Sequence, residues 1–324
     1  MRCRQPFPFQ AKAAYERDLV RLSRAGTRET PVTLTAPPQA AGRLALFAPV
    51  LLAAGAFAFA DVFVKVALND GADALTIVTA RGVLALPLIY CWLRLSPPIA
   101  PLTARERWIS YGLGMLFAGN VYFLIEAIRI ITVPVAILTY FIYPLLTGLG
   151  AAATGIEKLT WRGVIAAIIA LVGLALMLGA HPTALSARGV AAAIVAACCR
   201  VAMLLVTRAA MQGADARLIT WHSSISTSVV FVGLSLLLMH WQPPASAAGW
   251  FVVVLLGIAM TAGILGIFAS TARIGPFRTA LFMNLEPPLT AAGSALILGE
   301  VITPLQAVGG AIMIGALVAF QIRR

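Results

Sequence analysis

The stretch YPLLTGLGAAATGIEKLT at residues 143–160 is similar to EPPLTAAGSALILGEVIT at residues 286–303. A shift of 143 positions brings identical residues together, among them Pro144 and Pro287, Leu146 and Leu289, Thr147 and Thr290, Gly150 and Gly293, Glu157 and Glu300, and Thr160 and Thr303. Both copies are rich in Gly and Ala and begin with a proline. The match therefore predicts that the chain contains two copies of one helical unit.

The composition around these stretches is that of a membrane protein. Hydrophobic residues make up 60% of the chain, charged residues make up 11%, and the mean hydropathy is +0.93. Because a soluble chain of 324 residues must present charge to water, this balance excludes a soluble globular class. The net charge of +12 lies in short segments between apolar runs, so we do not interpret it as a nucleic-acid surface.

Helix breakers and charges divide the apolar part of the chain into about ten predicted transmembrane spans, since a crossing needs roughly 20 apolar residues. The predicted spans are 46–68, 74–94, 108–127, 133–152, 162–180, 188–208, 218–240, 249–271, 278–297 and 303–321. The expected fold is an all-α polytopic membrane protein.

The positions of Lys and Arg predict the orientation. If the amino end is cytoplasmic, nineteen basic residues fall in cytoplasmic segments, and the outer loops keep only Arg129 and Arg188. This asymmetry predicts that both termini are cytoplasmic, in a bacterial inner membrane. Each copy, 46–180 and 181–324, holds five spans, so the two copies must cross in opposite directions. Two inverted five-helix repeats are an architecture of secondary transporters.

The two copies resemble the EamA repeat of the drug/metabolite transporter superfamily over residues 46–321. The first copy shows Pro144, Glu157 and Gly173, and the second shows Pro287, Gly299-Glu300 and Gly309-Gly310. Arg81 also resembles an arginine often found in the second span, whereas Ile156 departs from the usual glycine. The resemblance implies a carrier of amino acids, nucleobases, sugars or other solutes, and it does not specify which.

Ionisable groups are costly inside a bilayer, so each needs a partner, a wet cavity or a role. The candidates for an intramembrane charge network or for ion coupling are Asp61, Lys65, Glu126, Arg200 and Glu286. Asp61 can pair with Lys65 four residues on, Arg81 with Glu126, and Arg200 with Glu286. Alternatively, Glu286 binds and releases a proton during transport.

The candidate substrate-binding residues are Arg81, Asn120, Tyr140, Tyr143 and Asn284. Arg81 would hold an anionic group such as a carboxylate, and the other four would add polar groups to a mostly apolar cavity. The structural alternative is that Arg81 forms an ion pair that never touches substrate. Pro144 and Pro287 each remove a backbone hydrogen bond and are candidate hinges.

Residues 1–45 carry eight basic and three acidic residues and lack the apolar core of a signal peptide. We expect a cytoplasmic tail, either disordered or lying on the membrane surface as a basic amphipathic helix.

The favoured function is secondary transport, with export favoured, of an amino acid or related polar solute by alternating access. Other readings are a translocase for a lipid or lipid-linked sugar, a channel, and a membrane-embedded enzyme. No phosphate-binding glycine loop or catalytic His motif occurs, so we expect no enzyme activity, no metal and no cofactor. The expected partners are a small-molecule substrate and membrane lipids. A monomer suffices, and a dimer is compatible with the pattern.

Overall fold

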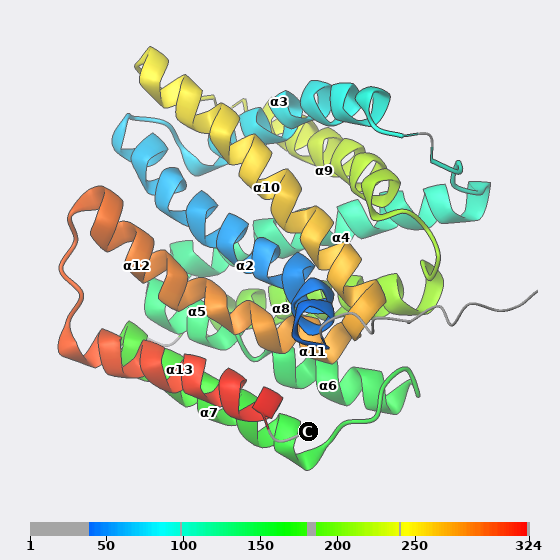
Figure 1. Ribbon diagram of the computed structural model, residues 1–324. Coiled ribbons are helices and arrows are strands. Elements are labelled where there is room, and N and C mark those ends of the chain that lie inside the picture. The colour runs from blue at the N-terminus through cyan, green and yellow to red at the C-terminus, as the bar shows by residue number, and fades with distance from the viewer. Residues whose placement is uncertain (1–38, 98, 180–185, 240, 323–324) are drawn as a thin grey trace, which may run out of the picture. The chain divides into compact units, whose positions relative to one another are not determined.

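The computed structural model describes residues 39–97, 99–179, 186–239 and 241–322 (Figure 1). The chain divides into two units, Met1–Gly42 and Arg43–Arg324. Most of the predicted basic tail, residues 1–38, lies outside the described residues. The account below therefore concerns the second unit.

The described residues of this unit are helical, and no strand occurs among them. The helices are α2 (Gln39–Asn69), α3 (Ala74–Leu95), α4 (Ala104–Ile130), α5 (Val133–Tyr140), α6 (Tyr143–Ala153), α7 (Trp161–Leu178), α8 (Ala187–Ala210), α9 (Ala216–Leu238), α10 (Ala247–Ile274), α11 (Pro276–Phe282), the 3-10 turn η1 (Met283–Leu285), α12 (Glu286–Leu298) and α13 (Pro304–Ile322).

Nine spans of the described chain are long and apolar enough to cross a membrane, with α5 and α6 counted as one. The all-helical, polytopic membrane fold predicted from the sequence is therefore confirmed. The span expected at 278–297 differs, because it is divided into α11, η1 and α12, each too short to cross alone. The helices run roughly side by side (Figure 1). We call one end of the unit the Glu300 end, where α2, α4, α7 and α12 finish, and the other the Glu157 end, where α6 finishes.

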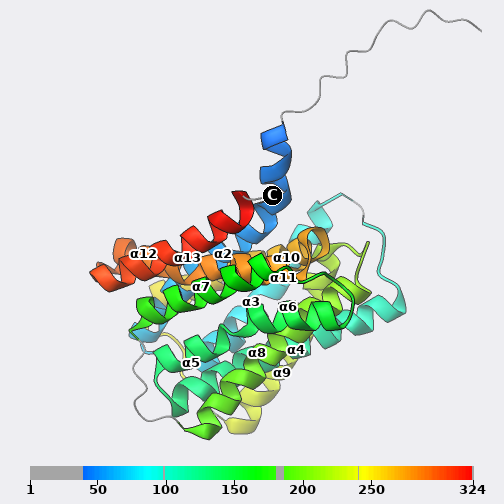
Figure 2. The ribbon, with the colours of Figure 1, turned by 90° about the horizontal axis from the view of Figure 1, so that it is seen from below.

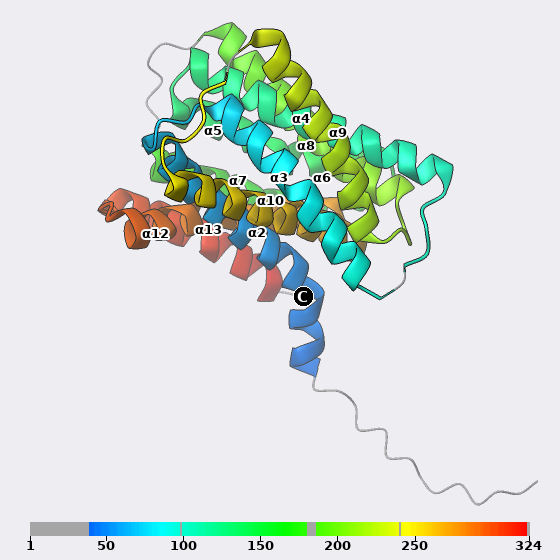
Figure 3. The ribbon, with the colours of Figure 1, turned by 90° about the horizontal axis from the view of Figure 1, so that it is seen from above.

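The two halves of the sequence interleave in space. Helix α4 packs against α8 and α9, and α3 packs against α9 and α10. Figure 2 shows α7 and α13 side by side, and Figure 3 shows α3 beside α9 and α10. Each of these pairs joins a helix before residue 180 to a helix after it. Five-helix halves are thus not separate bundles, and the inverted relationship between them stays a prediction.

Two proline-containing spans are broken at corresponding places. Helix α5 ends at Tyr140 and α6 starts at Tyr143, immediately before Pro144. In the second copy the break is η1, immediately before Glu286 and Pro287. Proline has no N–H and its ring crowds the carbonyl one turn earlier, so the helix cannot continue regularly through these positions. The shift of 143 found in the sequence carries residues 141–142 onto 284–285, within η1.

Helices α7 and α13 approach each other closely through a pair of glycines. A Cβ placed on Gly173 would lie 2.8 Å from the Gly309 carbonyl oxygen, and one on Gly309 would lie 2.5 Å from the Gly173 carbonyl oxygen. Only glycine at both positions lets the two backbones touch in this way. The Gly173 and Gly309 positions of the two predicted repeats are therefore in direct contact.

Two loops from different halves are tied together at the Glu300 end. Asp73 caps α3 by accepting the backbone N–H of Leu75 at 2.8 Å, and it also accepts the N–H of Gln242 at 3.1 Å. Asp70 accepts the backbone N–H of Ser246 at 2.9 Å. Partial burial raises the pKa of Asp73, but the hydrogen bonds from Thr76, Gln242 and Leu75 outweigh it and leave that pKa below its ordinary value. The charged carboxylate therefore stabilises this loop pair.

Candidate functional site

A pocket of about 690 Å³ extends from the middle of the unit to its Glu300 end. It is walled largely by aliphatic and aromatic side chains. Residues at the mouth come from the last turns of α2 and α4 and the start of α3, namely Leu68, Arg129 and Ala74. The polar groups in its lining are those of Asp61, Arg81, Asn120, Arg129, Tyr140, Arg200, Glu286 and Thr290. Helices from both halves of the chain thus build one pocket.

Six of the predicted ionisable or polar site residues lie in this lining, together with the candidate hinge Pro287. They are Arg81, Asn120, Tyr140, Asp61, Arg200 and Glu286. These residues come from α2, α3, α4, α5, α8 and α12 and are far apart in sequence. Whether they bind a substrate stays a prediction, but the structure does bring them to one place.

Asp61 and Arg81 form one opposite-charge couple of the pocket. Arg81 is buried on α3, while Asp61 on α2 is reached by solvent from within the pocket. The two attract each other electrostatically. The Thr290 hydroxyl of α12 donates a hydrogen bond to Asp61 at 3.3 Å. Asp61 therefore links α2 in the first half to α12 in the second.

Arg200 has a different environment, made of aromatic rings. Its side chain is 4% exposed, and its guanidinium carbon lies 5.4 Å from the Phe57 ring centre and 5.7 Å from that of Tyr143. Contacts of this length are cation–π interactions, which stabilise a cation without neutralising it. The Nε atom is buried and has no hydrogen-bond partner. Arg200 thus holds an unused donor beside the pocket.

The other predicted pocket residues are held by the helices around them. The Asn120 amide donates to the Ala196 carbonyl at 2.9 Å and so joins α4 to α8. The ring of Tyr140 packs 5.2 Å from that of Tyr143. Glu286, at the start of α12, is half-buried and lines the pocket. These contacts fix the polar groups on rigid helices, which is how a site is positioned accurately.

Several predicted site residues lie outside the lining. Tyr143 is buried behind Arg200, and its hydroxyl donates to the Ala280 carbonyl at 3.5 Å. The Asn284 amide donates to the Leu281 carbonyl at 2.9 Å, within the break between α11 and α12. Pro144 is buried at the start of α6. These residues shape the broken spans and do not face the pocket.

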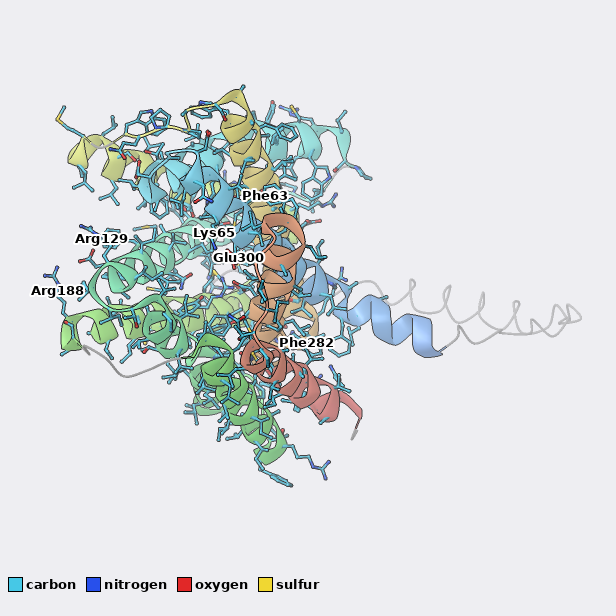
Figure 4. The ribbon with its side chains drawn as sticks, turned by 90° about the vertical axis from the view of Figure 1, so that its left-hand side faces the viewer. Phe63, Lys65, Arg129, Arg188, Phe282 and Glu300 are labelled. Carbon is cyan, nitrogen blue, oxygen red and sulfur yellow. The ribbon has the colours of Figure 1, made fainter. Side chains whose placement is uncertain are left out.

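The ion pairs expected from sequence are wrong in three cases. Lys65 pairs with Glu300 instead of Asp61, and Figure 4 shows Lys65 of α2 beside Glu300, which lies in the loop after α12. Glu126 pairs with Arg129 at 3.4 Å and Arg188 at 3.3 Å instead of Arg81. Arg200 and Glu286 attract each other, but no ion pair forms between them. Spacing and depth along one helix cannot reveal a partner that packing supplies from another helix.

The Glu300 end is polar and accessible. The side chains of Lys65 and Glu300 are 51% and 44% exposed. Arg129 and Arg188 lie at the same end (Figure 4), and both form ion pairs with Glu126. The Lys65–Glu300 pair joins the last turns of α2 to the residue after α12. It lies at the end of the unit where the pocket opens.

The Glu157 end carries a second charged cluster, and it is more enclosed. Glu157, 20% exposed, accepts the backbone N–H of Phe277 at 3.2 Å and lies 3.9 Å from the Arg278 Nε. Gly275, at a φ of +91°, lies against the Glu157 carboxylate, where a Cβ would approach its oxygen to 2.7 Å. Arg208 and Arg273 line the same small cavity. This cluster also joins the first half of the chain to the second.

Residues 187–320 match the family model described as the EamA-like transporter family. Over these residues the chain is similar to that family. The resemblance predicted from the sequence is thereby confirmed for this region, and the match supports a membrane transporter of the drug/metabolite transporter type. The EamA-matched region contains Arg200, Glu286, Pro287 and Glu300.

Comparison with solved structures supports the same fold. One crystal structure is similar with a TM-score of 0.67 and 18% identity, and the match covers 86% of this chain and 99% of that one. At this identity the likeness concerns the fold alone. A search of curated protein sequences finds no match.

Sequence reasoning missed three contributors to the site. Phe57 underlies Arg200, Thr290 donates to Asp61, and Glu300 binds Lys65. Thr290 and Glu300 were visible as matched positions of the repeat, so identity between the copies was a usable signal. Phe57 gave none, because one Phe among 15 in apolar helices has no distinguishing pattern.

Proposed function

We propose that the protein is a secondary transporter that exports a small polar metabolite, of the amino-acid class, across a bacterial inner membrane. One observation carries this proposal: helices from both halves build an apolar pocket of about 690 Å³ whose lining contains two acidic and three basic side chains. Small-molecule sites are commonly apolar cavities with a few aimed polar groups. An inverted pair of repeats would let such a site face each side in turn.

The two charged clusters suit the gates of an alternating-access cycle. Lys65–Glu300 at one end and Glu157–Arg278 at the other both connect the two halves of the chain. Under the repeat shift of 143, Glu157 corresponds to Glu300, and Lys65 corresponds to Arg208, which lies in the Glu157 cluster. An inverted repeat would use one device twice, once on each side of the membrane. We assign the Glu300 end to the outside and both termini to the cytoplasm.

Pro144 and Pro287 fit the role of hinges in this cycle. Each stands just after a break in a helix, and the breaks are buried beside the pocket. A broken span can bend at low cost, because its backbone hydrogen bonds are already interrupted. Bending at the two breaks would exchange the open end of the pocket for the closed one.

A lipid-like cargo is the second candidate, because apolar side chains dominate the pocket wall. A small polar solute would bind mainly to the charged groups of the pocket, whereas a lipid chain would bind mainly to its apolar wall. We expect no cofactor in either case, no catalytic chemistry, and no nucleic-acid partner. One chain supplies both repeats, so a monomer suffices and a dimer is compatible with the proposal.

Counterflow in proteoliposomes tests the proposal. Purified full-length protein is reconstituted, and exchange of labelled amino acids, nucleobases, sugars and polyamines is measured. Saturable exchange of one class, beyond that of protein-free vesicles, is the expected result. No exchange by protein shown to be folded would overturn the solute proposal, and translocation of a fluorescent lipid in the same vesicles would replace it with the second candidate.

A further inference from the structure

Arg200 and Arg81 are the two buried basic side chains among the described residues, at 4% and 7% exposed, and neither forms an ion pair with an acid there. Lys65, Arg129, Arg188, Arg217 and Arg278 each lie within 4 Å of a carboxylate oxygen. Arg200 has no such ion pair among the described residues, although it is more deeply buried than any of them. A buried guanidinium in a membrane span is costly unless something compensates it.

Aromatic rings supply part of the compensation. Phe57 and Tyr143 lie beside the guanidinium, at 5.4 and 5.7 Å from its central carbon. The Tyr143 side chain also interacts with the guanidinium by hydrogen bonding, but the buried Nε stays without a partner. The unpartnered Nε follows directly from this arrangement. The protein thus pre-positions a planar donor and leaves a hydrogen bond unmade.

The pocket gives this donor access to a ligand. Arg200 belongs to the lining, which also contains aliphatic side chains such as those of Val64, Ile77 and Ile125. The acid that attracts it, Glu286, lines the same pocket without forming an ion pair. A guanidinium binds a planar carboxylate through parallel hydrogen bonds, a geometry that an ammonium group cannot supply.

We infer that Arg200, and not Arg81, is the residue that binds the carboxylate of the transported solute. This inference rests on the proposed function, since it takes the pocket to be the transport site. The aliphatic wall would receive the apolar part of the same solute. The solute class is therefore a small carboxylate with an apolar substituent. Arg81 differs because none of its side-chain nitrogens is buried without a hydrogen-bond partner, whereas the Nε of Arg200 is.

The test compares carboxylates with their amides on purified full-length protein. The probes are L-leucine, L-phenylalanine and isovalerate, each against its carboxamide, and the readout is thermal stabilisation of wild-type protein, Arg200→Gln, Arg200→Lys and Arg81→Gln. We expect wild-type protein to bind at least one acid about ten- to a hundred-fold more tightly than its amide, as a hydrogen bond to a charged group implies. Arg200→Gln should lose this preference, Arg200→Lys should keep part of it, and Arg81→Gln should retain it.

Two results would overturn the inference: an acid preference that survives in Arg200→Gln, or wild-type protein that binds no acid better than its amide at tens of millimolar. The wild-type comparison decides even if Arg200→Gln fails to fold. Counterflow separates this inference from the proposed function. Acid binding without exchange would remove transport and keep the Arg200 subsite, whereas exchange indifferent to the carboxylate would do the reverse.

Discussion

The two ends of the molecule carry related charges in different settings. At the Glu157 end the carboxylate is 20% exposed, accepts a backbone N–H and is pressed against Gly275. At the Glu300 end the corresponding carboxylate is 44% exposed, binds one lysine, and lies beside the pocket mouth. The Glu157 carboxylate is thus the more enclosed of the two, and the Glu300 carboxylate belongs to a more exposed pair. Under the proposed alternating-access cycle, this difference corresponds to one closed end and one open end.

Cross-linking each end should have the largest effect. In a background lacking Cys3, Cys91, Cys198 and Cys199, we expect a short bifunctional thiol reagent to abolish exchange in Glu157→Cys/Arg278→Cys, because the closed end can no longer open. Linking Lys65→Cys with Glu300→Cys should also abolish exchange, by closing the other end. Exchange is compared before and after the reagent in the same protein.

Accessibility distinguishes the two cross-linked forms. A cysteine at Ile125, in the pocket wall, should stay reactive to an impermeant thiol reagent when the Glu157 end is linked. It should become protected when the Glu300 end is linked. Linking Glu126→Cys to Arg188→Cys is the matched control, since α4 and α8 pack closely and should move together. Equal reactivity in all three would contradict the assignment of ends.

Alanine substitutions of two glycines should differ in stability. Gly275 and Gly299 have φ of +91° and +70°, so alanine is strained at both, at about 1–2 kcal/mol. Only at Gly275 would the new Cβ also meet Glu157, whereas nothing lies within 4 Å at Gly299. We expect Gly275→Ala to lower the free energy of unfolding by about 2–4 kcal/mol. Titration with SDS in mixed micelles measures both, and equal losses would mean that the Glu157 end is not tightly packed.

Acid should loosen the loop pair at the Glu300 end. Because the folded state lowers the pKa of Asp73, its charged form stabilises folding above the ordinary aspartate pKa, and this contribution is lost as pH falls through the folded-state value. Asp73→Asn should cost about 1 kcal/mol at neutral pH, as for a lost helix cap, and little at low pH. Unfolding curves of both proteins from pH 7 to pH 3 measure this. Parallel curves would exclude a role for the charge.

The smallest effect is expected for the exposed pair itself. Glu300→Gln should change the free energy of unfolding by about 0.2–1 kcal/mol, the usual range for an ion pair in contact with water. Glu157→Gln should cost more, because its carboxylate also accepts a backbone N–H in a less exposed place. The same SDS titration ranks the two. If Glu300→Gln proved the more destabilising, the Glu300 end would be the tighter gate.

The sequence predicted the membrane fold and the helix positions well, because apolar length and helix breakers act locally. The predicted span 74–94 corresponds to α3 at Ala74–Leu95, for example. The division of 278–297 was harder to foresee. Pro287 predicted a kink at this place. The length of η1 could not be predicted, because it depends on packing around Asn284.

The site could be predicted as a set of residues but not as a set of contacts. The cost of burying charge singled out six residues, of which Asp61, Arg81, Arg200 and Glu286 line one pocket and Lys65 and Glu126 do not. The partner of each charged side chain depends on which helices pack next to its own. That packing joins helices far apart in the sequence, so spacing along one helix does not predict it. For the same reason Lys65 was matched to a neighbour on its own helix, although Glu300 was its partner.

The contact between Gly173 and Gly309 also bears on how the protein is made. Helix α7 leaves the ribosome long before α13, yet its glycine face has no other helix that approaches so closely. Until α13 is synthesised, this narrow face lacks the helix that packs on it. Helix α13 then covers it, backbone against backbone. A chain that stops before α13 would therefore leave the Gly173 face of α7 uncovered.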